Sequence, residues 1–202
     1  MNTENGVRVW DPLVRVFHWS LVAAFVISYL SGDDFETVHV WSGYFIAGLL
    51  VIRILWGVVG TRHARFRDFL YRPSVTVDYA RRMLTGSHPR YLGHNPLGGW
   101  MALALIITLS GVVLSGMATL GAEEGEGPMA FLAADAGGPG VVMADEPGEH
   151  GEGEELHEIL VNLSLLLIGL HILGVLTESL MHRENLARAM VTGKKRSNDE
   201  SE

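Results

Sequence analysis

Four long apolar segments dominate this sequence of 202 residues. They cover about residues 14–31, 39–60, 97–121 and 156–181. Each has close to the roughly 20 residues that a helix needs to cross membrane hydrocarbon, the first only with its flanking residues. A soluble chain would alternate apolar and polar residues, so the pattern predicts an all-α integral membrane protein, a bundle of four transmembrane helices. His18 and Trp19 in the first segment, with no cleavage site after it, argue against a cleaved signal peptide.

The basic residues are distributed unevenly between the connections. The 15 Lys and Arg lie around the start of the first segment, between the second and third, or after the fourth, apart from Arg53 within the second. The connection SGDDFETV and residues 122–155 contain neither. By the positive-inside rule, both termini and residues 61–95 are expected on the cytoplasmic side of a bacterial inner membrane. The net charge of −8 then reflects an acidic outer face, and no nucleic-acid partner is expected.

The segments and connections predict one membrane domain and a tail. The four-helix domain is expected to cover residues 1–193, with a flexible acidic outer loop at 122–155. Residues 194–202 are predicted to be a disordered cytoplasmic tail. Membrane lipid is therefore an expected partner, whereas the sequence makes no prediction of oligomeric state.

Three local patterns predict helix starts and interfacial helices. Asp11 followed by Pro12 favours a helix N-terminus, because the carboxylate caps and the proline lacks the unneeded N–H. PSVTVDYARRMLTG is typical of a short amphipathic helix in the lipid headgroups, and RENLARAM is a second candidate. The following KKR is expected to meet anionic lipid heads.

The sequence contains no cysteine. This excludes a covalently attached c-type haem, which needs a C-x-x-C-H motif, and thiolate-ligated iron–sulfur clusters. It also excludes disulfides. Any redox cofactor must therefore be bound by nitrogen or oxygen ligands.

Four histidines within or at the ends of the apolar segments pair by depth. His157 and His171 are fourteen residues apart, so on a helix they share one face, within about 40°, and differ in depth by roughly 21 Å. His39 starts the second span on the outer side, level with His157. His18 lies near the cytoplasmic end of the first, level with His171. Each pair can hold one haem iron from both sides, which leaves no open metal position for a substrate.

Glycines near these histidines have two interpretations. Gly43 follows His39 by one helical turn, and Gly169 and Gly174 flank His171. They either admit a flat macrocycle close to the backbone or pack helices together through small residues. A histidine in a span can also simply hydrogen-bond to a neighbouring helix.

Several motifs together resemble the bacterial di-haem cytochrome b family. The matching segments are VWDPLVRVFHW, HVWSGY, RILWGVVG, GHNPLGGWM, HEILVNLSLLLIGLH and HRENLARAMVTGKKR, which cover nearly the whole chain. That family contains the cytochrome b subunits of nickel-iron hydrogenases and the bacterial cytochromes b561. The resemblance implies two non-covalent haem b groups with His18, His39, His157 and His171 as axial ligands. The acidic, Gly-rich outer loop departs from it, because nothing there identifies a hydrogenase as the partner.

Three further residues are candidates at the cytoplasmic end. His94 and Asn95 could bind a quinone through hydrogen bonds to its carbonyls, with His94 passing protons. Alternatively, Asn95 caps the helix that starts at Pro96. Arg53 could pair with a haem propionate or extend to the interface. The remaining histidines, His63, His88, His150 and His182, are expected to be solvated or interfacial.

These features predict a di-haem b-type cytochrome that moves electrons across the inner membrane between the quinone pool and a periplasmic redox partner. The acidic loop would steer a basic c-type cytochrome by charge. Alternatives are the membrane anchor of a hydrogenase or dehydrogenase, or a superoxide:quinone oxidoreductase, so the sequence leaves open whether the chain is an enzyme itself. A metal-ion transporter is a remote alternative, because imidazole binds zinc, copper or nickel, yet the spans hold almost no carboxylates besides Glu158 and Glu178.

Overall fold

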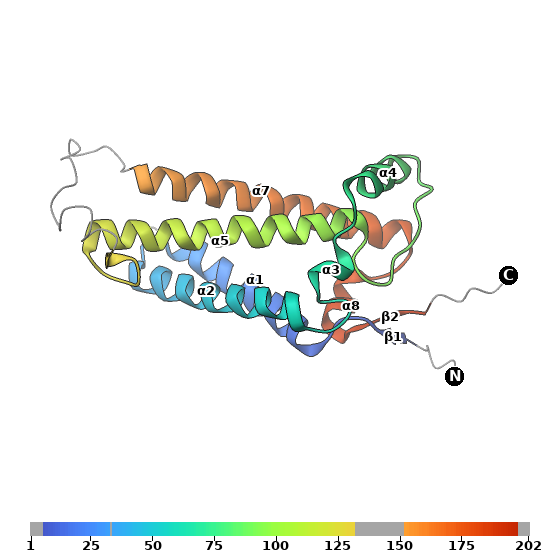
Figure 1. Cartoon of the computed structure of the whole chain (residues 1–202), viewed down its shortest axis with the longest axis horizontal. Coiled ribbons are helices and arrows are strands. Elements are labelled where there is room, and N and C mark those ends of the chain that lie inside the picture. The colour runs from blue at the N-terminus through green and yellow to red at the C-terminus, as the bar shows by residue number, and fades with distance from the viewer. Residues whose placement is uncertain (1–5, 33, 132–151, 198–202) are drawn as a thin grey trace.

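Four long helices form the bundle in the computed structural model, which describes residues 6–32, 34–131 and 152–197 (Figure 1). The helices are α1 (Pro12–Ser31), α2 (Glu36–Val59), α5 (Pro96–Glu124) and α7 (Glu152–Met181). They form two hairpins, because α1 packs mainly on α2 and α5 on α7, with further contacts between α2 and α5. The predicted four-helix membrane bundle is confirmed.

The outer faces of these helices are apolar. Val26, Leu55, Ile107 and Leu176, one from each helix, expose 49%, 61%, 61% and 55% of their surface. Each helix also contains a window with a mean hydropathy between 1.7 and 2.4, and the chain thus has four helices long and apolar enough to cross a membrane. Apolar surface of this extent suits lipid rather than water. The chain is a multi-pass inner-membrane protein.

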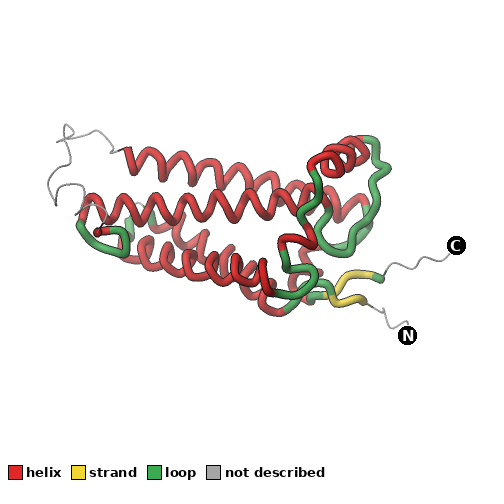
Figure 2. Tube along the Cα trace, viewed as in Figure 1, coloured by secondary structure: helices red, strands yellow, loops and turns green. Residues whose placement is uncertain are grey.

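Short elements gather at one end of the bundle (Figure 2). They are α3 (Phe66–Phe69), α4 (Pro73–Leu84), α8 (Leu186–Thr192) and the antiparallel strands β1 (Gly6–Arg8) and β2 (Lys194–Arg196). We call this the basic end, and the opposite end the acidic end. α4 and α8 are the two short helices predicted from the sequence. Gly86 and Gly193, with φ of 71° and 78°, allow the chain to turn after them.

The residues that start α1 also connect it to the end of α2. Oδ1 of Asp11 accepts a hydrogen bond from the backbone N–H of Val14 at 2.9 Å, which confirms the predicted cap. Its Oδ2 accepts from Nε1 of Trp56 at 3.1 Å and from the hydroxyl of Thr61. One carboxylate therefore holds both helices of the first hairpin at the basic end.

The prediction of a disordered tail from residue 194 is wrong for its first residues. Lys195 pairs with Val7 in the β1–β2 ribbon and is only 7% exposed. Its Nζ donates to the carbonyl oxygen of Tyr91 at 3.0 Å and lies 4.0 Å from Oε2 of Glu184. Burial lowers the pKa of Lys195. This lysine is thus not available to lipid headgroups, and residues 198–202 lie outside the described residues.

An ion pair fastens the segment before α5 to the segment after α7. Arg90 donates from Nε and Nη2 to the two carboxylate oxygens of Glu184, at 3.1 and 2.8 Å. The backbone N–H of Arg196 also donates to Glu184, at 2.9 Å. Burial alone would raise the pKa of Glu184, but these hydrogen bonds outweigh it and lower the pKa. The basic end is therefore built from segments far apart in the sequence.

The outer connection between α5 and α7 is shorter at both ends than the loop of residues 122–155 that the sequence predicts. α5 continues to Glu124, and α7 begins at Glu152. Residues 132–151, on which most of the predicted flexible loop falls, lie outside the described residues.

Candidate functional site

His39 on α2 and His157 on α7 face each other near the acidic end. Their ring centres are 6.1 Å apart and their planes cross at 78°. Two imidazoles that share one metal ion, each with a metal–nitrogen bond of about 2 Å, hold their ring centres roughly 6 Å apart. The spacing therefore fits a single metal ion between the two rings.

Backbone carbonyls fix which nitrogen of each ring is free. Nδ1 of His39 lies 2.9 Å from the carbonyl oxygen of Ser28, and Nδ1 of His157 lies 3.0 Å from that of Val112. A carbonyl can only accept, so both Nδ1 atoms carry the hydrogen and both Nε2 atoms keep a lone pair. Ser115 supports His157 further, because its Oγ is 3.0 Å from the same Nδ1. Metal-binding histidines are typically held by such hydrogen bonds.

His18 on α1 and His171 on α7 are the second predicted pair, and both lie toward the basic end. Both rings are partly buried. Nδ1 of His18 is buried and has no hydrogen-bond partner among the described residues. Along α7, His171 lies roughly 21 Å from His157. The structure thus brings His39 and His157 together, whereas the pairing of His18 with His171 stays a prediction.

The glycines beside the histidines face open space. A Cβ added at Gly43, Gly169 or Gly174 would meet no atom within 4 Å. Packing through small residues would instead place a neighbouring helix against them, as at Gly111, where Leu160 would lie 3.3 Å from the added Cβ. Of the two interpretations, room for a flat macrocycle therefore fits these three positions better.

Arg53 is 4% exposed, and its side chain is buried against α3 at the basic end. Its guanidinium lies 5.2 and 5.8 Å from the ring centres of Phe66 and Phe69, both on α3. Its Nη1 is buried without a hydrogen-bond partner in the described part of the chain. A buried donor of this kind is costly unless an acceptor joins it, and an anionic carboxylate such as a haem propionate suits it.

His94 lies in an aromatic setting at the basic end. Its ring centre is 4.8 Å from that of Trp10 and 4.6 Å from that of Phe69. Burial, together with the nearby charge of Arg53, lowers the pKa of His94 to about 3. Its Nδ1 is buried, and no described residue hydrogen-bonds to it. A small pocket of about 130 Å³ beside the ring is lined by Arg62, His63, Asp68 and Tyr71, among others.

Asn95 has two contacts within the protein. Its Oδ1 accepts from the backbone N–H of Gly98 at 2.6 Å, which caps α5. Its Nδ2 donates to Oε1 of Glu178 on α7 at 2.8 Å. The capping role considered from the sequence is therefore present, and Asn95 fixes the start of α5 next to His94.

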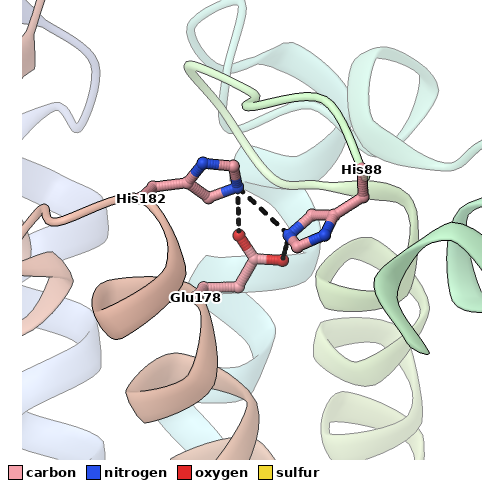
Figure 3. Close-up of side chains that lie close together, drawn as sticks. All are labelled: His88, Glu178 and His182. Atoms are coloured by element: carbon pink, nitrogen blue, oxygen red, sulfur yellow. Dashed lines mark hydrogen bonds and ion pairs between the residues drawn. The ribbon is translucent and has the colours of Figure 1, made fainter. Parts of the chain in front are cut away.

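A cluster missed by the sequence analysis surrounds Glu178 (Figure 3). His88 was expected to be solvated, but its side chain is 1% exposed and its ring centre lies 4.8 Å from that of His182. That prediction is wrong, because the loop before α5 folds over the end of α7. The three residues come from segments about ninety positions apart, so no local motif reveals them.

Comparison with known proteins identifies the family. Residues 9–193 match the family model described as prokaryotic cytochrome b561. The chain belongs to the prokaryotic cytochrome b561 family. As a b-type cytochrome, this cytochrome b561 family member binds haem b and transfers electrons, and the histidine pairs and the open space beside them fit that cofactor.

Two relatives of this cytochrome b561 family member span nearly its whole length. One, named a probable Ni/Fe-hydrogenase B-type cytochrome subunit, is from Bradyrhizobium diazoefficiens and is 23% identical, over 96% of this chain and 87% of its own. A protein of the same name from Rhizobium leguminosarum bv. viciae is 22% identical, over 95% and 90%. No solved structure matches the chain significantly.

Proposed function

We propose that the chain binds two haem b groups and carries electrons across the inner membrane, between a quinone at the basic end and a redox protein at the acidic end. One observation carries the proposal: α7 holds two histidines at different depths, and the outer one, His157, meets His39 of α2. A relay needs cofactors near both surfaces, and His157 and His171, roughly 21 Å apart along α7, provide two such positions.

The residues present would hold the cofactors and tune them. Each haem supplies an iron that cycles between two oxidation states. His39 and His157 would hold one group and His18 and His171 the other, so the chain would move electrons without binding a substrate on the metal. We call the haem between His18 and His171 the inner haem. Arg53 would pair with one of its propionates, and the positive charge of Arg53 would favour the reduced form of this haem.

His94 is the proposed quinone contact. Its Nδ1, which has no partner among the described residues, could hydrogen-bond with a quinone oxygen at the basic end. The adjoining pocket of about 130 Å³ has room for a few water molecules, which would connect this position to the solvent for proton exchange. Asn95 would act indirectly, because its cap on α5 fixes the start of that helix next to His94.

Reduction assays test the quinone contact. In a His94→Ala variant, we expect haem reduction by a quinol to slow at least tenfold, with reduction by dithionite unchanged. His63→Ala, which alters the same pocket from the other side, serves as the control and is expected to have a much smaller effect. Unchanged quinol-driven reduction in the His94 variant would remove the assignment.

Haem counting tests the relay itself. A reduced-minus-oxidised spectrum of the purified protein, with haem extracted and quantified per chain, is expected to give two b-type haems. His39→Ala or His157→Ala should lose one, and His18→Ala or His171→Ala the other, with a different remaining spectrum. Ser115→Ala is the matched control, because the Val112 carbonyl still holds His157. A single haem in the unaltered chain would end the relay proposal.

A second candidate function is that of a cytochrome b subunit anchored to a hydrogenase. The names of the two relatives favour it. Tagged chain isolated in mild detergent from its native cells would then bring down stoichiometric hydrogenase subunits. Isolation of the chain alone, still active in quinol-driven reduction, would favour a free electron carrier.

A further inference from the structure

Three residues with ligand-type atoms converge at the basic end, away from the proposed haem sites. Nε2 of His182 lies 3.1 Å from Nε2 of His88 and 3.3 Å from Oε2 of Glu178. Nε2 of His88 lies 3.4 Å from Oε1 of the same carboxylate. Figure 3 shows both rings turning these nitrogens toward the carboxylate. The cluster joins the loop before α5 to the last turn of α7.

The separations suit a metal ion. Neighbouring ligand atoms around an ion with bonds of about 2.0–2.1 Å are roughly 3.0–3.4 Å apart. The distances from Nε2 of His182 to Nε2 of His88 and to Oε2 of Glu178, 3.1 and 3.3 Å, lie in that interval. The His88 side chain is 1% exposed and that of Glu178 11%, so these groups have exchanged most of their water for one another. Without a cation, one of the two Nε2 atoms donates its hydrogen to the other, 3.1 Å away; with a cation, both nitrogens present lone pairs to it.

Neighbouring side chains hold the carboxylate in place. Tyr79 donates its hydroxyl to Oε1 of Glu178 at 2.5 Å, and Asn95 donates to the same oxygen at 2.8 Å. With Oε1 held by these two donors, Oε2 lies on the side of His182. Hydrogen bonds that orient a ligating carboxylate are a regular feature of metal sites. The His182 side chain is 18% exposed, which gives an ion and a fourth, water ligand access from the surface.

We propose that His88, Glu178 and His182 form a binding site for a divalent transition-metal ion, zinc above all. Two imidazoles and one carboxylate are a ligand set that zinc takes in proteins. The bound ion cross-links the loop that contains His88 to the end of α7, and so stabilises the basic end. The site is independent of the haem ligands and of the proposed electron transfer.

Zinc binding to the haem-loaded protein tests the site. The protein would be purified in detergent with a histidine-free tag, treated with EDTA, incubated with Zn²⁺ and desalted. Mass spectrometry of the metals is expected to find one retained zinc per chain, and zinc should raise the temperature of unfolding. His88→Gln and His182→Gln should each lose the retained zinc and its stabilising effect.

Controls separate the site from misfolding and from adventitious binding. Haem content reports folding of each variant, and His63→Gln removes a histidine of the same end that is not in the cluster, so zinc should be retained. X-ray absorption at the zinc edge of the unaltered protein should show two imidazole ligands, and it needs no variant. No retained zinc, equal retention in the His182 variant, or a spectrum without two imidazoles would overturn the proposal.

Discussion

At the scale of single residues, Arg53 offers a direct test of electrostatic tuning. Its Nη1 is buried and has no hydrogen-bond partner among the described residues. Its guanidinium lies beside the rings of Phe66 and Phe69. In Arg53→Gln we expect the midpoint potential of the inner haem to fall, because a lost positive charge disfavours the added electron. The expected fall is on the order of 60 mV, the one-electron equivalent of about 1.4 kcal/mol. Redox titration followed by absorbance measures it.

Arg53→Lys is the matched control. Because it keeps the positive charge, the midpoint potential of the inner haem should fall less than in Arg53→Gln. The outer haem, between His39 and His157, should shift little in either variant. An unchanged midpoint potential of the inner haem in Arg53→Gln would show that Arg53 does not pair with its propionate.

His94 makes stability depend on pH. Burial lowers its pKa in the folded state to about 3, whereas the unfolded chain protonates near the ordinary value of 6.5. Below 6.5 the unfolded state therefore binds a proton that the folded state does not, and stability falls as pH falls from about 6.5 toward 3. The slope contributed is at most about 1.4 kcal/mol per pH unit.

A neutral replacement isolates this contribution. In His94→Gln, we expect the unfolding temperature to decrease less between pH 7 and pH 5 than in the unaltered protein. Other histidines titrate in both proteins, so the difference between the two curves is the relevant quantity. Parallel curves would show that His94 is not held neutral by the fold.

At the scale of elements, the approach of α3 to α5 depends on a glycine. A Cβ at Gly99 would lie 2.2 Å from the carbonyl oxygen of Phe69, closer than real atoms approach. Gly99→Ala should therefore cost about 1–3 kcal/mol through forced backbone shifts. Gly48→Ala is the matched control, because nothing lies within 4 Å of its added Cβ and alanine favours the helix. Thermal unfolding in detergent compares the two, and equal losses would contradict the packing argument.

The long helices and the histidine pairs were predictable for one physical reason. Hydrocarbon requires about 20 apolar residues for each crossing, so an ionisable His171 inside such a segment is conspicuous. Helical spacing then gives depth, and depth gives the pairs. The tautomers were not predictable, because they depend on the carbonyls of Ser28 and Val112, which every residue possesses.

The basic end was harder to predict, because its contacts join distant segments. β2 has three residues, too few for an alternating pattern, and its KKR sequence suggested contact with lipid. Only the fold shows that Lys195 is buried against Tyr91. His88 and His182 likewise lie in polar segments where solvent exposure is the usual outcome. The spacing of four residues between Glu178 and His182 was a partial signal, because it places both side chains on one helix face, but it does not reveal His88.

At the scale of the whole molecule, the proposed haem groups would join the two hairpins. His157 on α7 meets His39 on α2, and the predicted pairing of His171 with His18 would connect α7 to α1, whereas direct contacts between the hairpins are mainly those of α2 with α5. Haem should therefore stabilise the bundle strongly. Ligand at a thousand times its dissociation constant contributes about 4 kcal/mol, or roughly 10 °C in unfolding temperature for a chain of this size. Thermal unfolding of haem-free and haem-loaded protein measures the difference, and coincident curves would contradict it.

The charge asymmetry between the two ends predicts how a partner arrives. Exposed carboxylates at the acidic end include those of Asp34, Glu36, Glu126 and Glu155. A basic c-type cytochrome should associate quickly at low salt and at least tenfold more slowly at high ionic strength, because salt screens the attraction. Stopped-flow electron transfer at several salt concentrations measures this dependence. Rates that do not fall with salt would exclude electrostatic steering.

The β1–β2 ribbon joins a strand synthesised before the first span to one synthesised after the fourth. The two strands can meet only when both lie on the same side of the membrane, so a chain with an odd number of inserted spans leaves them separated. Lys195 would then be far from the carbonyl of Tyr91, and both strand edges would stay unpaired. Closure of this small ribbon thus registers that biosynthetic insertion is complete, and an open ribbon gives the cell's proteases an exposed end on misinserted chains.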